Sequence, residues 1–354
     1  MESIVKETFL TSLSDCSSAR EIPDNVLFEL TYGCNYRCVH CLNPTHRALP
    51  QELTREEIFK ILEETAELGV LAMTFTGGEM FVRPDIFEIL RKAKSLGFLI
   101  DLLTNASLIT EAHAQALEQI GLEDIGVSIY GATQETYENV TAVPGSYPRF
   151  LAGLRALAKT KLHVKVRLPL MTLNSHELEA CKALVESFGF NFQPCLEIQP
   201  RQDGSLDPLQ YRLSPAEKVR LTELSWDLRT AEPISTDTCK LDGEFLDCAC
   251  GKKKFAVSPY GEMNLCVAFP APKYDLRKGS VRQGWEVLKN FARSLKPNQN
   301  YECPPCHLQK YCRQGRNDAW LETGDPSVCL PHFYDWASLE KKAYENANSA
   351  RAVR

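Results

Sequence analysis

The chain has 354 residues, of which 14 are cysteine, and its composition narrows the classes of protein to which it can belong. With 44% hydrophobic residues it can bury a core, and its length predicts about two domains. The net charge of −6 argues against a dedicated nucleic-acid binder. No apolar stretch approaches the roughly 18 residues of a membrane helix, and no signal peptide is evident. We therefore expect a cytoplasmic protein without membrane or nucleic-acid partners, whose reduced cysteines indicate metal or redox chemistry.

The region from residue 26 to 230 alternates between β-rich runs and amphipathic helical patterns. Strands are predicted at 26–32, 71–76, 99–104, 125–129, 164–170 and 192–199. Helices are predicted from Thr54, where Thr54–Glu57 forms a capping-box pattern, and at 85–95, 110–120, 147–159, 175–188 and 214–229. Six βα repeats predict an α/β fold, a partial (β/α)6 TIM-like barrel, since a complete barrel has eight repeats.

The cysteines fall into three groups, which divide the chain into a catalytic domain and a smaller cysteine-rich one. The groups are Cys34, Cys38 and Cys41; then Cys239, Cys248, Cys250 and Cys266; then Cys303, Cys306, Cys312 and Cys329. Cys16, Cys181 and Cys195 stand alone and are interpreted as ordinary residues. The predicted boundaries are 1–25 for an N-terminal extension, 26–230 for the barrel, 231–335 for the cysteine-rich domain and 336–354 for a terminal helix.

The first cysteine group directly follows the first predicted strand. Three thiolates within eight residues can hold one metal centre, but a structural zinc site needs four ligands. A 4Fe–4S cluster with three cysteines instead keeps one iron open for a substrate or cofactor. The alternatives are a zinc site with a distant fourth ligand and a surface loop with incidental cysteines.

The CxxxCxxC loop of Cys34, Cys38 and Cys41 resembles that of the radical S-adenosylmethionine (radical SAM) superfamily, and His40 stands where the family usually has an aromatic residue. One strand later, Gly77-Gly78-Glu79 matches the family's GGE motif, with Met80 where proline is frequent. Glycines allow the backbone to approach a ligand closely. The resemblance implies that the open iron chelates S-adenosylmethionine (SAM) and that the carboxylate takes its ammonium group.

Two further strand ends match positions that contact SAM in the family. The resemblance implies that Asn105 and Ser128 help to hold the ribose and carboxylate of SAM, although both residue types also cap and turn the chain locally. Arg149 and Arg167 are either carboxylate-binding or solvated surface residues.

The later cysteines resemble the SPASM extension of radical SAM enzymes that modify peptides. Cys250-x10-Gly261-x4-Cys266, Cys303-x2-Cys306-x5-Cys312 and Cys329 match six of its seven cysteines, and Arg316 occupies the seventh position. The resemblance implies that Cys303, Cys306, Cys312 and Cys329 hold a complete outer 4Fe–4S cluster. An inner cluster would keep Cys250 and Cys266, with Cys248 as third ligand and either Cys239 or an open iron as the fourth. The alternative is a zinc ribbon, with His307 and His332 as substitute ligands.

The resemblance implies reductive cleavage of SAM to a 5′-deoxyadenosyl radical, which abstracts a hydrogen atom from the substrate, with three 4Fe–4S clusters in all. A ribosomally synthesised peptide is the expected substrate, undergoing crosslinking, oxidation or backbone excision. We expect a separate leader-peptide-binding protein, because only about 25 residues precede the first strand, and an external flavodoxin or ferredoxin as electron donor. The alternatives are a small-molecule dehydrogenase, a protein-activating radical SAM enzyme and a non-catalytic iron–sulfur or zinc protein. Tyr130, Glu197 and Gln199 are candidates at the barrel mouth, but no catalytic acid or base is identified.

Overall fold

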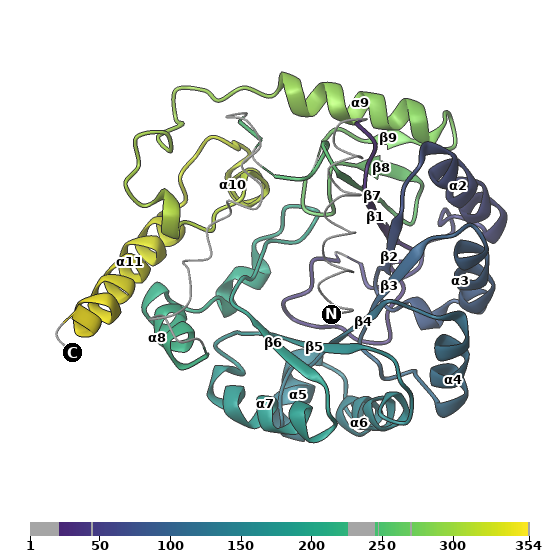
Figure 1. The fold of residues 1–354 in the computed structure, drawn as a ribbon, viewed down its shortest axis with the longest axis horizontal. Coiled ribbons are helices and arrows are strands. Elements are labelled where there is room, and N and C mark those ends of the chain that lie inside the picture. The colour runs from purple at the N-terminus through teal and green to yellow at the C-terminus, as the bar shows by residue number, and fades with distance from the viewer. Residues whose placement is uncertain (1–20, 44, 226–244, 247, 270, 353–354) are drawn as a thin grey trace.

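A computed structural model describes residues 21–352 apart from 44, 226–244, 247 and 270. Its six N-terminal strands form a curved parallel sheet with helices on its outer side (Figure 1). The strands are β1 (Asn25–Glu29), β2 (Ala72–Thr76), β3 (Leu99–Thr104), β4 (Asp124–Ser128), β5 (Val164–Pro169) and β6 (Asn191–Cys195). All six predicted strands are present and are ordered sequentially, so the expected partial barrel is confirmed.

The helices that cover the barrel follow the predicted repeats, with one addition. They are α2 (Arg55–Leu68), α3 (Ile86–Ser95), α4 (Glu111–Ile120), α5 (Gln134–Thr141), α6 (Ser146–Leu157), α7 (Leu178–Ser187) and α8 (Pro215–Ser225). The capping box of α2 forms as predicted, since the Thr54 hydroxyl accepts from the Glu57 amide and the Glu57 carboxylate accepts from the Thr54 amide. The sequence did not predict α5, which begins at a Thr133 cap and is mostly polar.

Alternating side chains place the core between the sheet and its helices. Val26, Phe28 and Phe75 are fully buried on the helix-facing side, where the rings of Phe28 and Phe75 lie 6.2 Å apart. The opposite side chains, such as Leu27 and Thr74, line the inside of the barrel. The hydrophobic packing therefore stabilises the wall of the barrel and leaves its inner face for polar groups.

The C-terminal region continues the same sheet. Strand β7 (Lys254–Val257) pairs in parallel with β1, and β8 (Glu262–Asn264) and β9 (Tyr274–Asp275) extend the sheet in antiparallel fashion. The sheet therefore has nine strands in the order β6-β5-β4-β3-β2-β1-β7-β8-β9 within the described residues. Helix α9 (Val281–Ser294) packs beside α2 (Figure 1).

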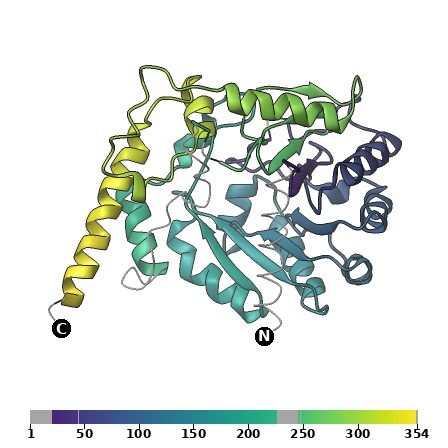
Figure 2. The same cartoon turned by 45° about the horizontal axis from the view of Figure 1, so that its top comes forward.

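The last two helices connect the cysteine-rich region to the other end of the barrel. Helix α10 (Arg316–Thr323) precedes α11 (Pro331–Ala352), which runs beside α8 in both views (Figures 1 and 2). Lys218 on α8 is buried there, with its Nζ 4.2 Å from the Trp336 ring centroid and 3.7 Å from a Glu197 carboxylate oxygen. Among the described helices, none is both long enough and apolar enough to span a lipid bilayer.

Candidate active site and auxiliary cysteine sites

The first three cysteines lie together on the loop that follows β1. Cys38 is buried, and burial together with the neighbouring thiols of Cys41 and Cys34 raises its pKa well above that of a free cysteine. Burial also raises the pKa of Cys34 to about 12. Desolvated thiols of this kind become thiolates when a cation compensates their charge, so the group fits a metal cluster.

Helix α5 fixes the cysteine loop in place. The amides of Arg37 and Val39 donate to the carbonyls of Thr141 and Val140 at 2.9 and 3.0 Å. These two bonds hold the middle of the loop against the end of α5. No cysteine or glycine pattern marks this support; the only sequence signal is the threonine cap at Thr133, and that signal was missed.

The Gly77-Gly78 turn packs against the cysteine loop itself. A Cβ atom on Gly77 would lie 2.3 Å from the Thr31 carbonyl oxygen, and one on Gly78 would lie 2.3 Å from the Gly33 carbonyl oxygen. The Gly78 amide donates to Thr31 and the Glu79 amide to Gly33, at 2.7 and 2.8 Å. The two glycines thus allow a close backbone contact inside the protein, in addition to any approach to a ligand.

Glu79 and Asn105 are brought together at the ends of β2 and β3. The Glu79 carboxylate is 1% exposed and accepts hydrogen bonds from Thr104 Oγ1, at 2.8 and 2.9 Å, and from the Asn105 amide at 2.7 Å. Burial raises the pKa of Glu79 to about 7. The Asn105 side chain donates to Asn35 on the cysteine loop at 2.9 Å. This network links the GGE motif, the third strand and the cysteine loop.

Ser128 ends β4, and its side chain is hydrogen-bonded to Tyr130. Tyr130 is buried and packs against His40 of the cysteine loop, with ring centroids 5.2 Å apart. Arg149 is exposed on α6, and its charge acts on Tyr36 of the cysteine loop. Of the residues predicted to contact SAM, Glu79 and Asn105 are joined directly by a hydrogen bond. Ser128 is connected to the cysteine loop through Tyr130, which packs against His40.

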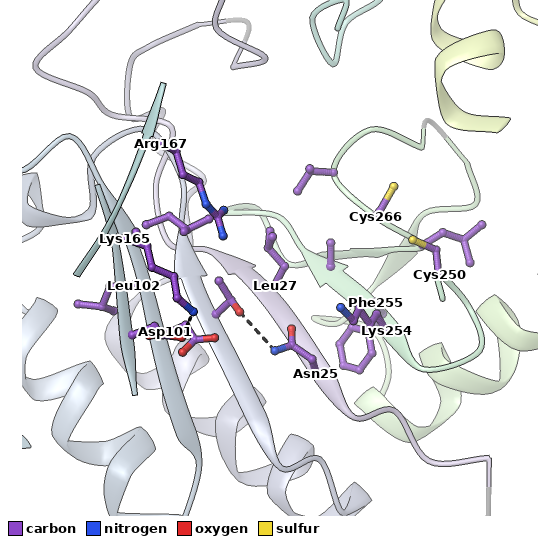
Figure 3. A pocket seen from close by; sticks show the side chains of 17 residues that line it. Asn25, Leu27, Asp101, Leu102, Lys165, Arg167, Cys250, Lys254, Phe255 and Cys266 are labelled. Carbon is purple, nitrogen blue, oxygen red and sulfur yellow. Dashed lines mark hydrogen bonds and ion pairs between the residues drawn. The ribbon is translucent and has the colours of Figure 1, made fainter. Parts of the chain in front are cut away.

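The inner auxiliary cysteines border a cavity of about 390 Å³ inside the barrel (Figure 3). Cys250 is hydrogen-bonded to both Cys248 and Cys266, so three of the predicted inner ligands meet. Cys239 lies outside the described residues. Arg167 points into the same cavity from β5, where Lys165 is paired with Asp124 at 2.7 Å. Figure 3 shows Cys250 and Cys266 across the cavity from these charged side chains.

The four outer cysteines line a second cavity, of about 380 Å³. Cys303, Cys306, Cys312 and Cys329 all contribute to its wall. Burial, together with the charges of the three neighbouring thiols, raises the pKa of Cys329 to about 11. A hollow walled by four thiols fits a cluster. Within the described residues, no three His, Cys, Asp or Glu side chains are close enough for a single ion, and a cubane cluster spaces its cysteines more widely than one ion does.

The remaining candidates are held by protein contacts. Gln199 donates to Asp318 of α10 at 2.6 Å, and Glu197 lies beside Lys218. Of the solitary cysteines, Cys181 is fully buried on α7, and Cys16 lies outside the described residues. Of the two histidines considered as substitute zinc ligands, His332 contacts Arg212 at 3.2 Å and His307 is exposed.

This fold and these cysteine groups define a radical SAM enzyme with a SPASM-like C-terminal extension. The family model described as the radical SAM superfamily matches residues 28–185, a stretch that runs from β1 to α7. Enzymes of this class use SAM and 4Fe–4S clusters.

Two curated relatives and one solved structure show the range of similar proteins. The AdoMet-dependent heme synthase of Methanosarcina barkeri is 27% identical over 86% of this chain and 94% of that protein. Mycofactocin maturase MftC of Mycobacterium tuberculosis is 24% identical over 86% of this chain and 81% of that protein. The crystal structure of Streptococcus suis SuiB bound to its precursor peptide SuiA has a TM-score of 0.68 at 16% identity, covering 87% of this chain and 75% of that chain. This last likeness concerns the fold.

Proposed function

We propose that this protein is a radical SAM enzyme that modifies a ribosomally synthesised peptide. When bound, SAM and a reduced 4Fe–4S cluster supply a 5′-deoxyadenosyl radical that removes a hydrogen atom from the substrate. Cys34, Cys38 and Cys41 would hold the catalytic cluster, and Gly77, Gly78, Glu79, Asn105 and Ser128 would form the SAM site. The surrounding residues would position SAM and exclude water from the inside of the barrel.

The observation that carries this proposal is the pair of auxiliary cysteine groups beside the barrel. Cys303, Cys306, Cys312 and Cys329 would hold an outer cluster, and Cys248, Cys250 and Cys266 an inner one. Cys250 and Cys266 of the inner group border the cavity inside the barrel, so a cluster held there would face that cavity and could accept an electron from a substrate bound in it. The peptide-bound SuiB, which shares the fold, supports a peptide as the substrate.

A second candidate is a reaction on a precursor of haem. It is favoured by the match to the heme synthase, which is the more identical of the two relatives and extends over 94% of that protein. The cationic Arg167 at the cavity suits a carboxylate on either kind of substrate.

Anaerobic reconstitution followed by reduction with SAM tests the proposal. Three clusters require roughly twelve irons per chain, and turnover should release 5′-deoxyadenosine. The enzyme is then supplied either with a precursor peptide encoded beside its gene or with an iron-containing haem precursor, and the product is identified by mass spectrometry. Modification of the peptide alone supports the leading candidate, and modification of the tetrapyrrole alone supports the second.

Two partners belong to the same proposal. A flavodoxin or ferredoxin would deliver the reducing electron, and a separate leader-binding protein would present the peptide. Product formation with a flavodoxin and its reductase, and its dependence on added leader-binding protein, would measure both contributions.

A further inference from the structure

Arg316 is the residue that replaces the seventh cysteine of the SPASM pattern, and it begins helix α10 next to the outer cysteines. Its side chain is 6% exposed, and its Nη2 atom donates to the Cys303 sulfur at 3.5 Å. A second nitrogen, Nη1, donates to the carbonyl of Pro326 at 3.3 Å. The guanidinium is therefore held through its two terminal nitrogens, Nη1 and Nη2, with one N–H directed at a thiol of the outer group.

Two aromatic rings hold the guanidinium in this orientation. The Arg316 carbon Cζ lies 5.1 Å from the Tyr301 ring centroid and 5.6 Å from that of Phe245. The two rings pack edge to face, with centroids 5.0 Å apart. Arginine suits such a site better than lysine because its planar group can stack and donate in fixed directions at the same time.

A positive charge that donates to a cluster sulfur favours the reduced cluster. Reduction adds one electron and makes the cluster more negative, so nearby cations and N–H···S bonds raise its reduction potential. We propose that Arg316, by donating a hydrogen bond to the Cys303 sulfur, raises the reduction potential of the outer auxiliary cluster. The residue is a positioning and tuning residue; it does not touch the substrate.

This inference rests on the proposed function, because it requires Cys303, Cys306, Cys312 and Cys329 to hold a cluster. It adds a direction of electron flow. By raising the potential of the outer cluster, Arg316 would favour the transfer to it of an electron that leaves the substrate through the inner cysteines. Arg316, which stands in place of the seventh cysteine, would thus tune the potential of a cluster and would not bind one.

The test is a redox titration of the reconstituted full-length enzyme followed by electron paramagnetic resonance. The outer cluster's signal is identified by its loss in Cys303→Ser. In Arg316→Gln we expect the ratio of reduced to oxidised outer cluster at a fixed potential to fall about tenfold, which corresponds to about 59 mV for one electron. Arg316→Lys, which keeps the charge but not the planar donor, should show a smaller fall.

Lys310→Gln is the matched control, because Lys310 is an exposed cation two residues from Cys312. It should leave the ratio within twofold of wild type. An unchanged ratio in Arg316→Gln, or an equal fall in Lys310→Gln, would overturn the proposal. Loss of about four irons from both Arg316 variants would also overturn it, since Arg316 would then serve cluster assembly. If Cys303→Ser removes no iron from the wild-type content, the ligand set of the proposed function has failed instead.

Discussion

At the scale of single residues, the cysteines differ in what surrounds them. Cys38 and Cys181 are both buried, but Cys38 has two other thiols beside it, and Cys181 lies among the apolar side chains of α7. The same side chain therefore suits two roles in this chain: the proposed cluster ligand where thiols gather, and a small apolar residue where they do not.

This contrast predicts the outcome of two alanine substitutions. Cys38→Ala should lose about four irons per chain and all release of 5′-deoxyadenosine, because two thiols cannot retain the catalytic cluster. Cys181→Ala, the control for loss of a buried thiol, should keep both. Iron is counted after anaerobic reconstitution, and nucleoside is measured by chromatography. Full iron content in Cys38→Ala would contradict the ligand assignment.

Glu29, at the end of β1, should make stability depend on pH. Burial raises its pKa to about 7, while hydrogen bonds from Gln202 favour the charged form. Because the folded pKa lies above the unfolded one, the contribution of Glu29 to stability is full below about pH 4.5 and is lost as the pH rises through 7. Glu29 alone should account for a loss on the order of 3 kcal/mol in the free energy of unfolding over this pH range.

Urea unfolding at pH 5, 6, 7 and 8, at constant iron content, measures this effect. Glu29→Gln should flatten the fall in the free energy of unfolding between pH 5 and 8. The exposed Glu186→Gln on α7 serves as the control and should keep the wild-type slope. Equal slopes in all three proteins would rule out this role for Glu29.

At the scale of elements, the contact between the β2 turn and the cysteine loop leaves no room for a side chain. Gly78→Ala would place a Cβ 2.3 Å from the Gly33 carbonyl oxygen, so the loop that carries Cys34 must move. We expect a loss of about 2–3 kcal/mol in stability together with reduced iron content.

Gly204→Ala provides the comparison for this substitution. Gly204 has a φ of +87°, but a Cβ there would meet nothing within 4 Å. The control should lose only about 1 kcal/mol, from backbone strain, and keep its iron. Melting temperature and iron count are read on both variants, and normal iron content in Gly78→Ala would show that the loop tolerates the displacement.

At the scale of the whole molecule, one sheet joins the barrel to the cysteine-rich region. A chain that ends at residue 225 would lack β7, so the outer edge of β1 would be unpaired, and it would lack α9, which packs beside α2. Open edges and uncovered apolar surface promote aggregation. We expect this truncated chain to aggregate on size-exclusion chromatography, whereas full-length protein elutes as a defined species. A folded, monodisperse truncated chain would show that the barrel is independent.

Local patterns predicted most of the barrel. Strands such as β3, with every second side chain buried, and helices such as α2, with a capping box and a terminal Gly69, carry their signals within a few residues. Strand β7 was missed because its four residues follow a basic run, and its partner β1 is distant in sequence. Pairing between strands so far apart in the sequence produces no local sequence pattern.

The candidate site divides in the same way. The cysteine spacing and the GGE motif could be recognised from the sequence, but the contacts of Glu79 could not. Its partners, Thr104 and Asn105, come from the end of the next strand, and the sequence does not show that they donate to the carboxylate. The Arg316–Cys303 contact could not be predicted from the sequence either, because a cysteine missing from a pattern does not indicate what its replacement contacts.

The pairing of β1 with β7 also determines when the sheet can be completed during synthesis. Asn25 pairs with Lys254, so 229 residues (254 − 25) separate the two strands. At a ribosomal rate of roughly 5–20 residues per second, β7 is synthesised about 10 to 45 s after β1. The Cys34–Cys41 loop follows β1 immediately and emerges early in that interval. The thiols proposed to hold the catalytic cluster are therefore open to iron delivery, and to oxygen, well before the sheet beside them is complete.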